Sequence, residues 1–253
     1  MVTVKPVADL DELIANAARD FVEVIHQVQA GGGKHGDGLA RVVLTGGGAG
    51  TGLLKELARL DAAATAQSET FPTLRVDWNR VHVFFGDERN VPVTDPESNE
   101  GQARAALLDH VDIPAGNIHG YGLGTAEMAT AAATYEETVQ QHAPQGFDLH
   151  LLGMGGEGHI NSLFPHTAAV RETGKLVVAV TDSPKPPAER VTLTLPAVNA
   201  ADQVWLLVSG AEKAEAAGHV VRGAEAVDWP AAGARGARET VLYLAQDAAG
   251  QVD

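Results

Sequence analysis

Apolar runs that end in glycines or in a dense group of charges recur along this chain, and they constrain its fold more than any other feature. Residues 41–45 (RVVLT) run into residues 46–52 (GGGAGTG), and residues 80–85 (RVHVFF) run into residues 86–89 (GDER). Such runs are typical of buried strands, and a strand that is apolar throughout needs cover on both faces. We therefore predict an α/β fold with a mostly parallel sheet and helices on both faces.

Helical patterns separate these runs. Asp9 is placed to cap a helix whose apolar face includes Leu13, Ala17 and Phe21. Other patterns predict helices over residues 53–60, 96–108 and 125–142, a surface loop over 62–73, and strands over 175–180, 191–195, 203–208 and 240–245. No linker, repeat or shift in composition divides the chain, so we expect residues 1–253 to form a single domain.

The charge and the cysteine count limit the partners and the chemistry. The chain has a formal net charge of −15 and no cysteine, which disfavours nucleic acid and anionic membranes and excludes disulfides and thiolate sites. The N-terminus lacks the features of a signal peptide, and no apolar run approaches the roughly 20 residues that span a membrane. We expect a cytoplasmic protein, in which an anionic ligand would need a local cluster of basic side chains and backbone N–H groups.

Residues 147–165 (FDLHLLGMGGEGHINSLFP) are the first candidate for chemistry. They predict a strand, a glycine turn, one histidine and a short turn of helix that proline stops. Ligands bind beyond the carboxyl ends of strands in open α/β sheets, and His159 is the next residue there that can move a proton. A short helix beginning at Gly158 would direct its positive end toward the ring and favour the neutral base.

Other segments offer groups that suit an anion. Glycines 46–48 lie between a strand and a helix, which can present N–H groups to a phosphate, although a plain tight turn is the alternative. Asp87 and Arg89 follow a strand directly, with a salt-bridged loop as the alternative. Arg190 lies at a proline-rich corner. Lys213 opposes a helix dipole unless an anion lies nearby, with an ordinary surface lysine as the alternative.

Competing motifs are incomplete. Residues 153–158 match G-x-G-x-x-G and Asp182 lies where a ribose-binding acid is expected, but Pro165 leaves no room for the long helix that NAD binding requires. Residues 31–38 contain a Gly-Lys pair without the strand or the Ser/Thr of a P-loop. Histidines 142, 150, 159 and 166 match no metal pattern, so we expect no metal. Ser162 is not in a nucleophile elbow, and a water activated by His159 is the simplest hydrolytic chemistry available.

Four ordered blocks of this sequence resemble the 6-phosphogluconolactonase family of the glucosamine-6-phosphate isomerase/6-phosphogluconolactonase superfamily. The blocks are residues 44–48 (LTGGG); 85–89 (FGDER) with 96–99 (PESN); 152–155 (LGMG) with 158–159 (GH) and 162–165 (SLFP); and 185–187 (KPP) with 189–190 (ER) and 192–196 (TLTLP). Residues 210–213 (GAEK) are a fifth, shorter match. Single blocks would be weak, but the ordered set spans residues 44–213 and is highly specific.

The resemblance implies a Rossmann-like fold and hydrolysis of 6-phospho-D-glucono-1,5-lactone to 6-phospho-D-gluconate in the pentose phosphate pathway, without a cofactor. It implies His159 as the catalytic histidine beside Asp87 and Arg89. The residues expected to bind substrate are Gly46, Gly47, Gly48, Gly155, Glu157, Gly158, Arg190 and Lys213, with Arg89 or the amides of residues 155–158 facing the oxyanion. The family usually has Ser-Thr-Pro in the first loop and Asp before Gly-His, where this chain has residues 48–51 (GAGT) and Glu157.

Two other functions stay open at this point. A hexosamine-6-phosphate isomerase or deaminase on the same scaffold would have Asn-Glu-Pro after Gly-His-Ile, where this chain continues with residues 161–164 (NSLF). A sugar-phosphate sensor would bind without turnover. We expect a phosphosugar lactone as the small-molecule partner, and a monomer.

Overall fold

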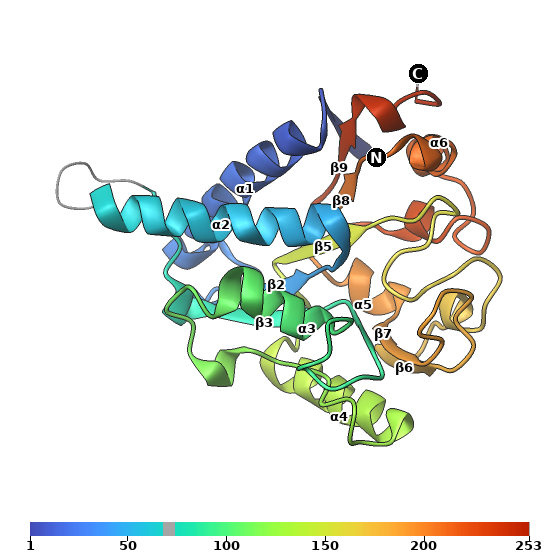
Figure 1. Ribbon diagram of the computed structural model, residues 1–253, viewed down its shortest axis with the longest axis horizontal. Coiled ribbons are helices and arrows are strands. Elements are labelled where there is room, and N and C mark those ends of the chain that lie inside the picture. The colour runs from blue at the N-terminus through green and yellow to red at the C-terminus, as the bar shows by residue number, and fades with distance from the viewer. Residues whose placement is uncertain (68–73, 253) are drawn as a thin grey trace.

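Helices and strands alternate along the chain (Figure 1). The computed structural model describes residues 1–67 and 74–252. The strands in these residues are β1 (Val2–Val7), β2 (Ala40–Leu44), β3 (Val81–Phe85), β4 (Asp87–Arg89), β5 (Leu149–Gly153), β6 (Val177–Val180), β7 (Arg190–Leu193), β8 (Gln203–Val208) and β9 (Glu239–Ala245). The α-helices are α1 (Leu10–Gln27), α2 (Gly47–Gln67), α3 (Asn99–Ala103), α4 (Met128–His142), α5 (Leu195–Asn199) and α6 (Ala214–Arg222).

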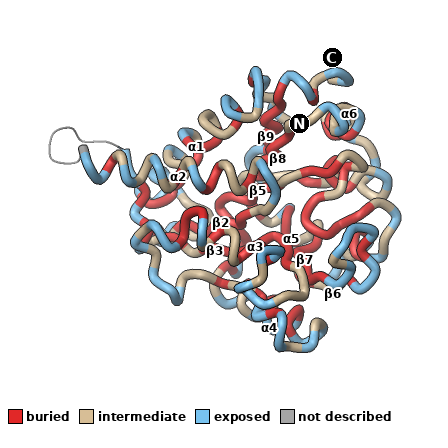
Figure 2. The backbone as a smooth tube through the Cα atoms, viewed as in Figure 1, coloured by how far each residue is buried: buried red, intermediate tan, exposed pale blue. Residues whose placement is uncertain are grey.

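The central sheet is parallel. In the described part of the chain it contains six strands in the order β1-β9-β8-β5-β2-β3, and every neighbouring pair is parallel. Its inner strands are buried and form the centre of the molecule (Figure 2). The glycine- and charge-terminated runs of the sequence are β2, β3 and β5, which confirms the prediction of a mostly parallel sheet.

The strand order determines where the helices lie and where a ligand can bind. The chain moves from β1 through β2 to β3 toward one edge, and then returns through β5, β8 and β9 toward the other. Because parallel crossovers are right-handed, this reversal changes the face that the helices cover. Helices α1 and α2 share one face and pack side by side (Figure 1). The reversal falls between β2 and β5, whose carboxyl ends open the crevice in which such sheets bind ligands.

The predicted strands at 175–180 and 191–195 do not join the central sheet. They form β6 and β7, which pair antiparallel with β4 in a separate sheet of order β4-β7-β6. Prolines 184, 186 and 187 lie between β6 and β7 and oppose a crossover helix there, so the chain returns directly as an antiparallel pair. Arg190 and Thr192 thereby come to lie opposite Arg89 and Asp87.

Helix α2 is longer than predicted. It begins at Gly47, inside the glycine loop, and continues to Gln67. The prediction of a loop over residues 62–73 is therefore wrong for 62–67, whose alanine-rich composition favours a helix, and residues 68–73 lie outside the described residues. Strand β1 was not predicted. It lies at the edge of the sheet beside β9, where Pro6 is tolerated.

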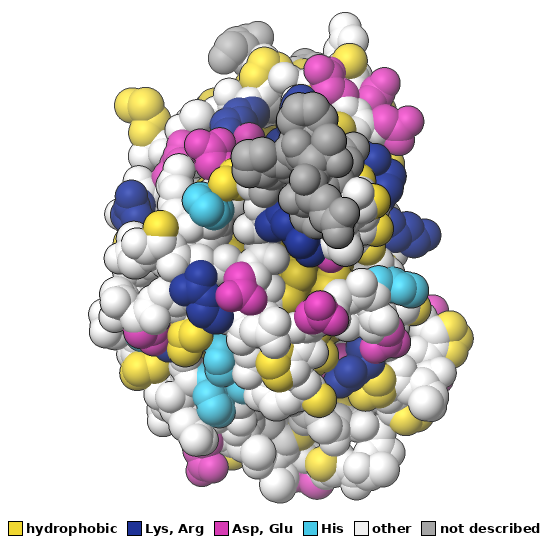
Figure 3. Space-filling view, turned by 90° about the vertical axis from the view of Figure 1, so that its left-hand side faces the viewer, with side chains coloured by type: hydrophobic (Ala, Val, Ile, Leu, Met, Phe, Trp, Pro, Cys, Tyr) yellow, Lys and Arg dark blue, Asp and Glu magenta, His cyan; other side chains and the backbone are white. Residues whose placement is uncertain are grey.

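The described surface gives no sign of a membrane segment. None of the described helices combines the length and the apolar character needed to cross a bilayer. The face shown in Figure 3 mixes basic with acidic side chains rather than gathering one sign of charge.

Candidate active site

A cavity of about 180 Å³ lies at the carboxyl ends of β2 and β5. This volume is below the roughly 300–1,000 Å³ of pockets for drug-sized ligands and suits a small metabolite. Its walls come from the strand ends and from the loops that follow them: Thr45, Gly46, Gly47, Gly48, Ala49, Asp87, Arg89, Asn99, Gly153, Met154, His159, Asn161, Arg190, Leu207 and Lys213. The cavity thus occupies the point where the strand order reverses.

Most of the predicted site residues meet in this cavity. Those that line it are His159, Asp87, Arg89, Gly46, Gly47, Gly48, Arg190 and Lys213. The sequence separates them by up to 167 residues (46 to 213). Gly155, Glu157 and Gly158 are not among its lining residues. They form the loop that carries His159.

The glycine loop presents the start of α2 to the cavity. The first N–H groups of a helix have no partner within the helix, and the dipole adds a partial positive charge. Gly47 has a φ of +78°, which favours glycine. A Cβ atom on Gly46 would collide with Oδ1 of Asn99. The glycines therefore allow a tight turn and a close approach to Asn99, and they leave backbone N–H groups facing the site.

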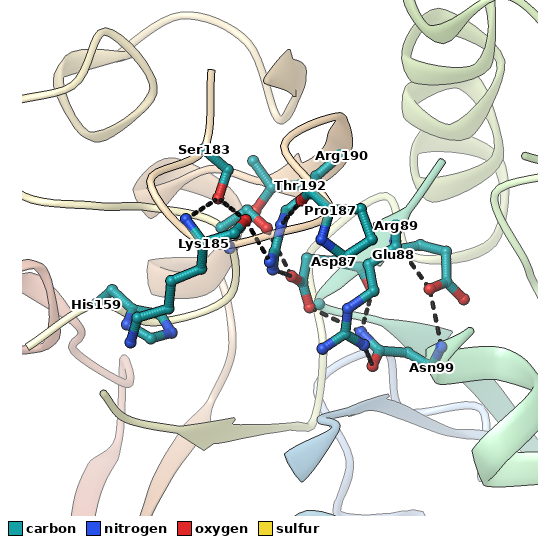
Figure 4. Close-up of polar contacts among 12 residues, drawn as sticks. Asp87, Glu88, Arg89, Asn99, His159, Ser183, Lys185, Pro187, Arg190 and Thr192 are labelled. Atoms are coloured by element: carbon teal, nitrogen blue, oxygen red, sulfur yellow. Dashed lines mark hydrogen bonds and ion pairs between the residues drawn. The ribbon is translucent and has the colours of Figure 1, made fainter. Parts of the chain in front are cut away.

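Asp87 is held from three sides (Figure 4). Its Oδ1 accepts a hydrogen bond of 3.0 Å from Nδ2 of Asn99, and its Oδ2 accepts one of 2.6 Å from Oγ of Ser162. Nη1 of Arg190 lies 3.8 Å from Oδ2. Ser162 is 1 % exposed and directs its hydroxyl at this carboxylate, which agrees with the prediction that it is not a nucleophile.

Glu88 points away from the cavity and anchors β4. Its Oε1 accepts hydrogen bonds from the backbone N–H groups of Arg89 (2.9 Å) and Asn99 (2.8 Å). Its Oε2 accepts from Oγ of Ser98 (2.9 Å) and the N–H of Glu100 (2.8 Å). Burial raises the pKa of Glu88, and these hydrogen bonds oppose that rise. The side chain ties β4 to the start of α3.

The two arginines are fixed by backbone carbonyls. Arg89 donates from Nη1 to the carbonyl of Glu97 (2.8 Å) and to Oδ1 of Asn99 (2.9 Å). Arg190 donates from Nε to the carbonyl of Pro187 (2.9 Å) and from Nη2 to that of Lys185 (3.1 Å). Burial lowers the pKa of Arg190, but a guanidinium stays charged at neutral pH.

The cavity is positive within a strongly acidic molecule. Its charged lining residues are Arg89, Arg190, Lys213 and Asp87, three cations and one anion, for a net charge of +2. Lys213 lies at the start of α6 and forms no ion pair with any described residue. This is the local cluster that an anionic ligand needs against a net charge of −15.

His159 stands on a tight loop rather than on a helix. The N–H of Gly155 donates to the carbonyl of His159 (3.0 Å), and the N–H of Gly158 donates to that of Gly155 (2.9 Å). The predicted helix at Gly158 is absent from residues 154–165, all of which are described. The N–H groups of Gly155 and Gly158 donate within the loop and are therefore not free for an oxyanion. That Arg89 or the amides of residues 156 and 157 face the oxyanion stays a prediction. Gly155 has a different use, because a Cβ atom there would collide with the His159 ring.

Burial keeps His159 uncharged. The ring stacks on Phe164 at a centroid distance of 4.5 Å and is mostly buried. Burial lowers the pKa of His159, the nearby carboxylate of Glu157 raises it, and the cation of Lys185 lowers it, with a net decrease. The prediction of a neutral imidazole has the right direction, but the cause is desolvation and not a helix dipole.

Glu157 connects His159 to Lys185. Its Oε1 lies 3.2 Å from Nδ1 of His159, close enough to form an ion pair when the ring is protonated but poorly directed for a hydrogen bond. Nζ of Lys185 lies 2.9 Å from Oε1 and 3.1 Å from Oε2 of the same carboxylate. Burial raises the pKa of Glu157, but the Lys185 hydrogen bond and the neighbouring His159 outweigh this and lower it to about 2. Figure 4 shows Lys185 reaching across to His159.

Asn161 and Lys185 are among the residues that sequence reasoning missed. The side chain of Asn161 lines the cavity and is 9 % exposed, yet neither its Nδ2 nor its Oδ1 has a hydrogen-bond partner among the described residues. Its φ of 49° is a left-handed conformation that asparagine tolerates. Lys185 was noted only as part of a sequence block. Nothing in the spacing of either residue indicates its contacts, because both are set by loops.

Comparison with known proteins agrees with this geometry. A profile of the family described as glucosamine-6-phosphate isomerases/6-phosphogluconolactonase matches residues 8–243. The chain is 48% identical over 222 residues to a 6-phosphogluconolactonase of Mycobacterium leprae (84% of this chain, 85% of the relative) and 46% identical over 253 residues to one of Mycobacterium tuberculosis (96% of each). A crystal structure of a 6-phosphogluconolactonase from Thermotoga maritima superposes with a TM-score of 0.79 at 25% identity, covering 97% of this chain and 100% of that one. The chain therefore belongs to the glucosamine-6-phosphate isomerase/6-phosphogluconolactonase family.

Proposed function

We propose that this protein hydrolyses 6-phospho-D-glucono-1,5-lactone to 6-phospho-D-gluconate, as a 6-phosphogluconolactonase. The observation that carries the proposal is the pairing of a neutral histidine with a positive cavity at the switch point of the sheet. The relatives that match nearly the whole chain bear this enzyme's name. The substrate is an anion with an ester carbonyl, and the cavity offers a group for each part.

The phosphate binds at the cationic end of the cavity. The N–H groups at the start of α2, Lys213 and the remaining donors of Arg190 supply hydrogen bonds and positive charge. Because the amides at the start of α2 and the guanidinium of Arg190 are held in place before the ligand arrives, little ordering of these groups is needed on binding. Asn161 lines the same cavity, and its amide, which is buried and without a partner among the described residues, is the group that we assign to the sugar hydroxyls.

His159 moves the protons. Glu157 faces Nδ1, so Nε2 is the nitrogen that removes a proton from water as the water oxygen attacks the lactone carbonyl. The tetrahedral intermediate then collapses, the bond from the carbonyl carbon to the ring oxygen breaks, and the protonated His159 returns the proton to that oxygen. The product acid ionises at neutral pH. Arg89 stabilises the oxyanion, and Asp87 positions a sugar hydroxyl or the arginines beside it.

Replacing His159 tests this assignment. His159→Asn should reduce turnover of freshly made lactone by about 10²-fold or more, measured as acid released above the spontaneous rate. His166→Asn is the matched control, because His166 is exposed and its left-handed backbone suits asparagine. A folded His159→Asn protein with nearly full activity would refute the role of His159.

The rival reaction within the family has its own assay. Release of ammonia from glucosamine 6-phosphate, without acceleration of lactone hydrolysis, would replace the proposal with a hexosamine-6-phosphate deaminase. Binding of 6-phosphogluconate without either reaction would indicate a sensor. We further propose that residues 1–253 act as one domain and as a monomer in the cytoplasm, without a cofactor or nucleic acid; light scattering of the purified protein tests the monomer.

A further inference from the structure

Three histidine side chains converge away from the candidate active site. His82 lies at the amino end of β3, whereas the cavity lies beyond the carboxyl ends of the strands. His119 follows the segment that pairs with Val83 along the outer edge of β3, and His142 is the last residue of α4. One ring nitrogen of each histidine lies within 4.8 Å of the other two. No motif in the sequence links these positions, because they come from three distant segments.

The rings are in direct contact. Nδ1 of His82 lies 2.9 Å from Nε2 of His119, so one of these nitrogens carries a proton and the other accepts it. The His119 ring stacks on Phe84 at a centroid distance of 4.6 Å and packs, tilted, against His142 at 4.4 Å. The His142 ring forms no hydrogen bond within residues 1–67 and 74–252. The cluster therefore has lone pairs that the protein itself does not fully use.

The separations suit one small cation. Zinc binds histidine nitrogen at about 2.0–2.1 Å, which in a tetrahedral site places the nitrogens about 3.3 Å apart. Nδ1 of His82 and Nε2 of His119 are 2.9 Å apart, and one ring nitrogen of each of the three histidines lies within 4.8 Å of the others, so the separations bracket this value. A metal ion would replace the proton now shared by His82 and His119.

Burial of the cluster favours neutral rings. Burial lowers the pKa of His119 to about 4, and burial and the cation of Arg41 lower the pKa of His82. Neutral imidazole is the form that binds metals. Arg41 is the cation that faces the cluster, and its charge is balanced by Asp37, whose two oxygens accept from it at 3.0 Å and 2.7 Å. Nε of Arg41 also donates to the carbonyl of His142 (2.6 Å), which holds the end of α4 beside the cluster.

We propose that His82, His119 and His142 form a binding site for a divalent transition metal ion, with zinc as the best-matched ion. Imidazole ligands suit zinc, copper and nickel, and three histidines leave a fourth position for water. The ion would connect β3, the segment that follows it and the end of α4. Its effect is to stabilise the folded protein by binding the folded state alone, and lactone hydrolysis proceeds without it.

Titration of the chelator-treated full-length protein with zinc chloride tests the site. Calorimetry should show one zinc ion per chain with a dissociation constant in the micromolar range or below, and zinc should raise the melting temperature. His142→Gln should weaken the binding at least tenfold, and His119→Gln should do the same. His26→Gln, an exposed histidine on α1, is the matched control and should bind zinc like the unaltered protein. His142 is half-exposed, so its variant should fold even if the His119 variant does not.

Two results would overturn the proposal. Equal zinc affinity in the His142→Gln and His26→Gln proteins would show that the cluster holds no metal. Binding that is lost in His159→Gln and kept in His142→Gln would place the zinc at the candidate active site instead. Lactone hydrolysis by His142→Gln should match that of the unaltered protein in the presence of chelator.

Discussion

The side-chain amide of Asn161 has no hydrogen-bond partner among the described residues, so the substitution Asn161→Gly tests whether it binds the substrate. Glycine adopts the φ of 49° without strain, and the free protein loses no hydrogen bond to a described residue. If the amide donates one hydrogen bond and accepts one in the bound state, its loss costs about 0.5–1.5 kcal/mol for each. The total of about 1–3 kcal/mol corresponds to a decrease in kcat/KM of about 5- to 150-fold.

The assay measures kcat/KM on fresh lactone together with thermal unfolding. Asn199→Gly is the matched control, because Nδ2 of Asn199 donates to the carbonyl of Gly233 (3.1 Å), its Oδ1 accepts from the N–H of Arg235 (2.8 Å), and Asn199 does not line the cavity. The control should lower the melting temperature and leave kcat/KM unchanged. Asn161→Gly should lower kcat/KM while its free energy of unfolding changes by no more than about 1 kcal/mol.

The reasoning is refuted if Asn161→Gly keeps kcat/KM within about twofold of the unaltered protein. A second variant separates shape from hydrogen bonding. Asn161→Asp keeps the shape and tolerates the same backbone, but it replaces the donor with a negative charge beside an anionic substrate. Its kcat/KM should fall further than that of the glycine variant.

Three more predictions follow from the charges of the site and the core. Glu157→Gln removes the carboxylate that raises the pKa of His159, so the acid limb of the kcat/KM profile should move to lower pH; an unmoved limb would contradict this coupling. Lys213→Ala should raise KM with little change in kcat, whereas Lys55→Ala on the exposed face of α2 should change neither. Burial lowers the pKa of His150 to about 3, so its unfolded form, with a pKa near 6.5, gains a proton first as the pH falls and the folded state loses stability. Between pH 7.5 and 5.5 this loss is about 1.4 kcal/mol in the free energy of unfolding. In denaturant titrations, the free energy of unfolding of His150→Leu should decrease by that much less over the same pH range.

Much of the fold follows from local sequence signals. The runs that became β2, β3, β5 and β8 are mostly apolar, each with one polar residue near its start, which is the pattern of strands covered on both faces. The capping side chain of Asp9 accepts from the N–H of Glu12 (2.9 Å), as its place before a periodic helix predicts. Strand β1 escaped prediction because its residues are polar at two places and include Pro6, and it is stabilised by pairing with the distant β9.

The site was predictable where its residues follow strands directly. His159, Asp87 and Arg89 come just beyond β5 and β3, so a parallel sheet brings them to one edge. The contacts that tune them depend on loops whose paths no local pattern specifies. Lys185 reaches Glu157 from the proline-rich turn after β6, and Asn161 faces the cavity only because of its left-handed backbone. The convergence of His82, His119 and His142 likewise depends on tertiary packing.

The three side chains of the short strand β4 point alternately to two opposite sides and have different roles. Asp87 and Arg89 line the cavity. Glu88, between them, points to the other side and accepts four hydrogen bonds. Successive side chains of a strand alternate between its two sides, so inserting or deleting a single residue between β3 and Asn90 would exchange these roles. The carboxylate of Glu88, which now contacts the start of α3, would then face the cavity. The guanidinium of Arg89 would point into the protein. Substitutions in this segment can therefore leave the site intact, whereas a change in the number of residues between β3 and Asn90 would disrupt it.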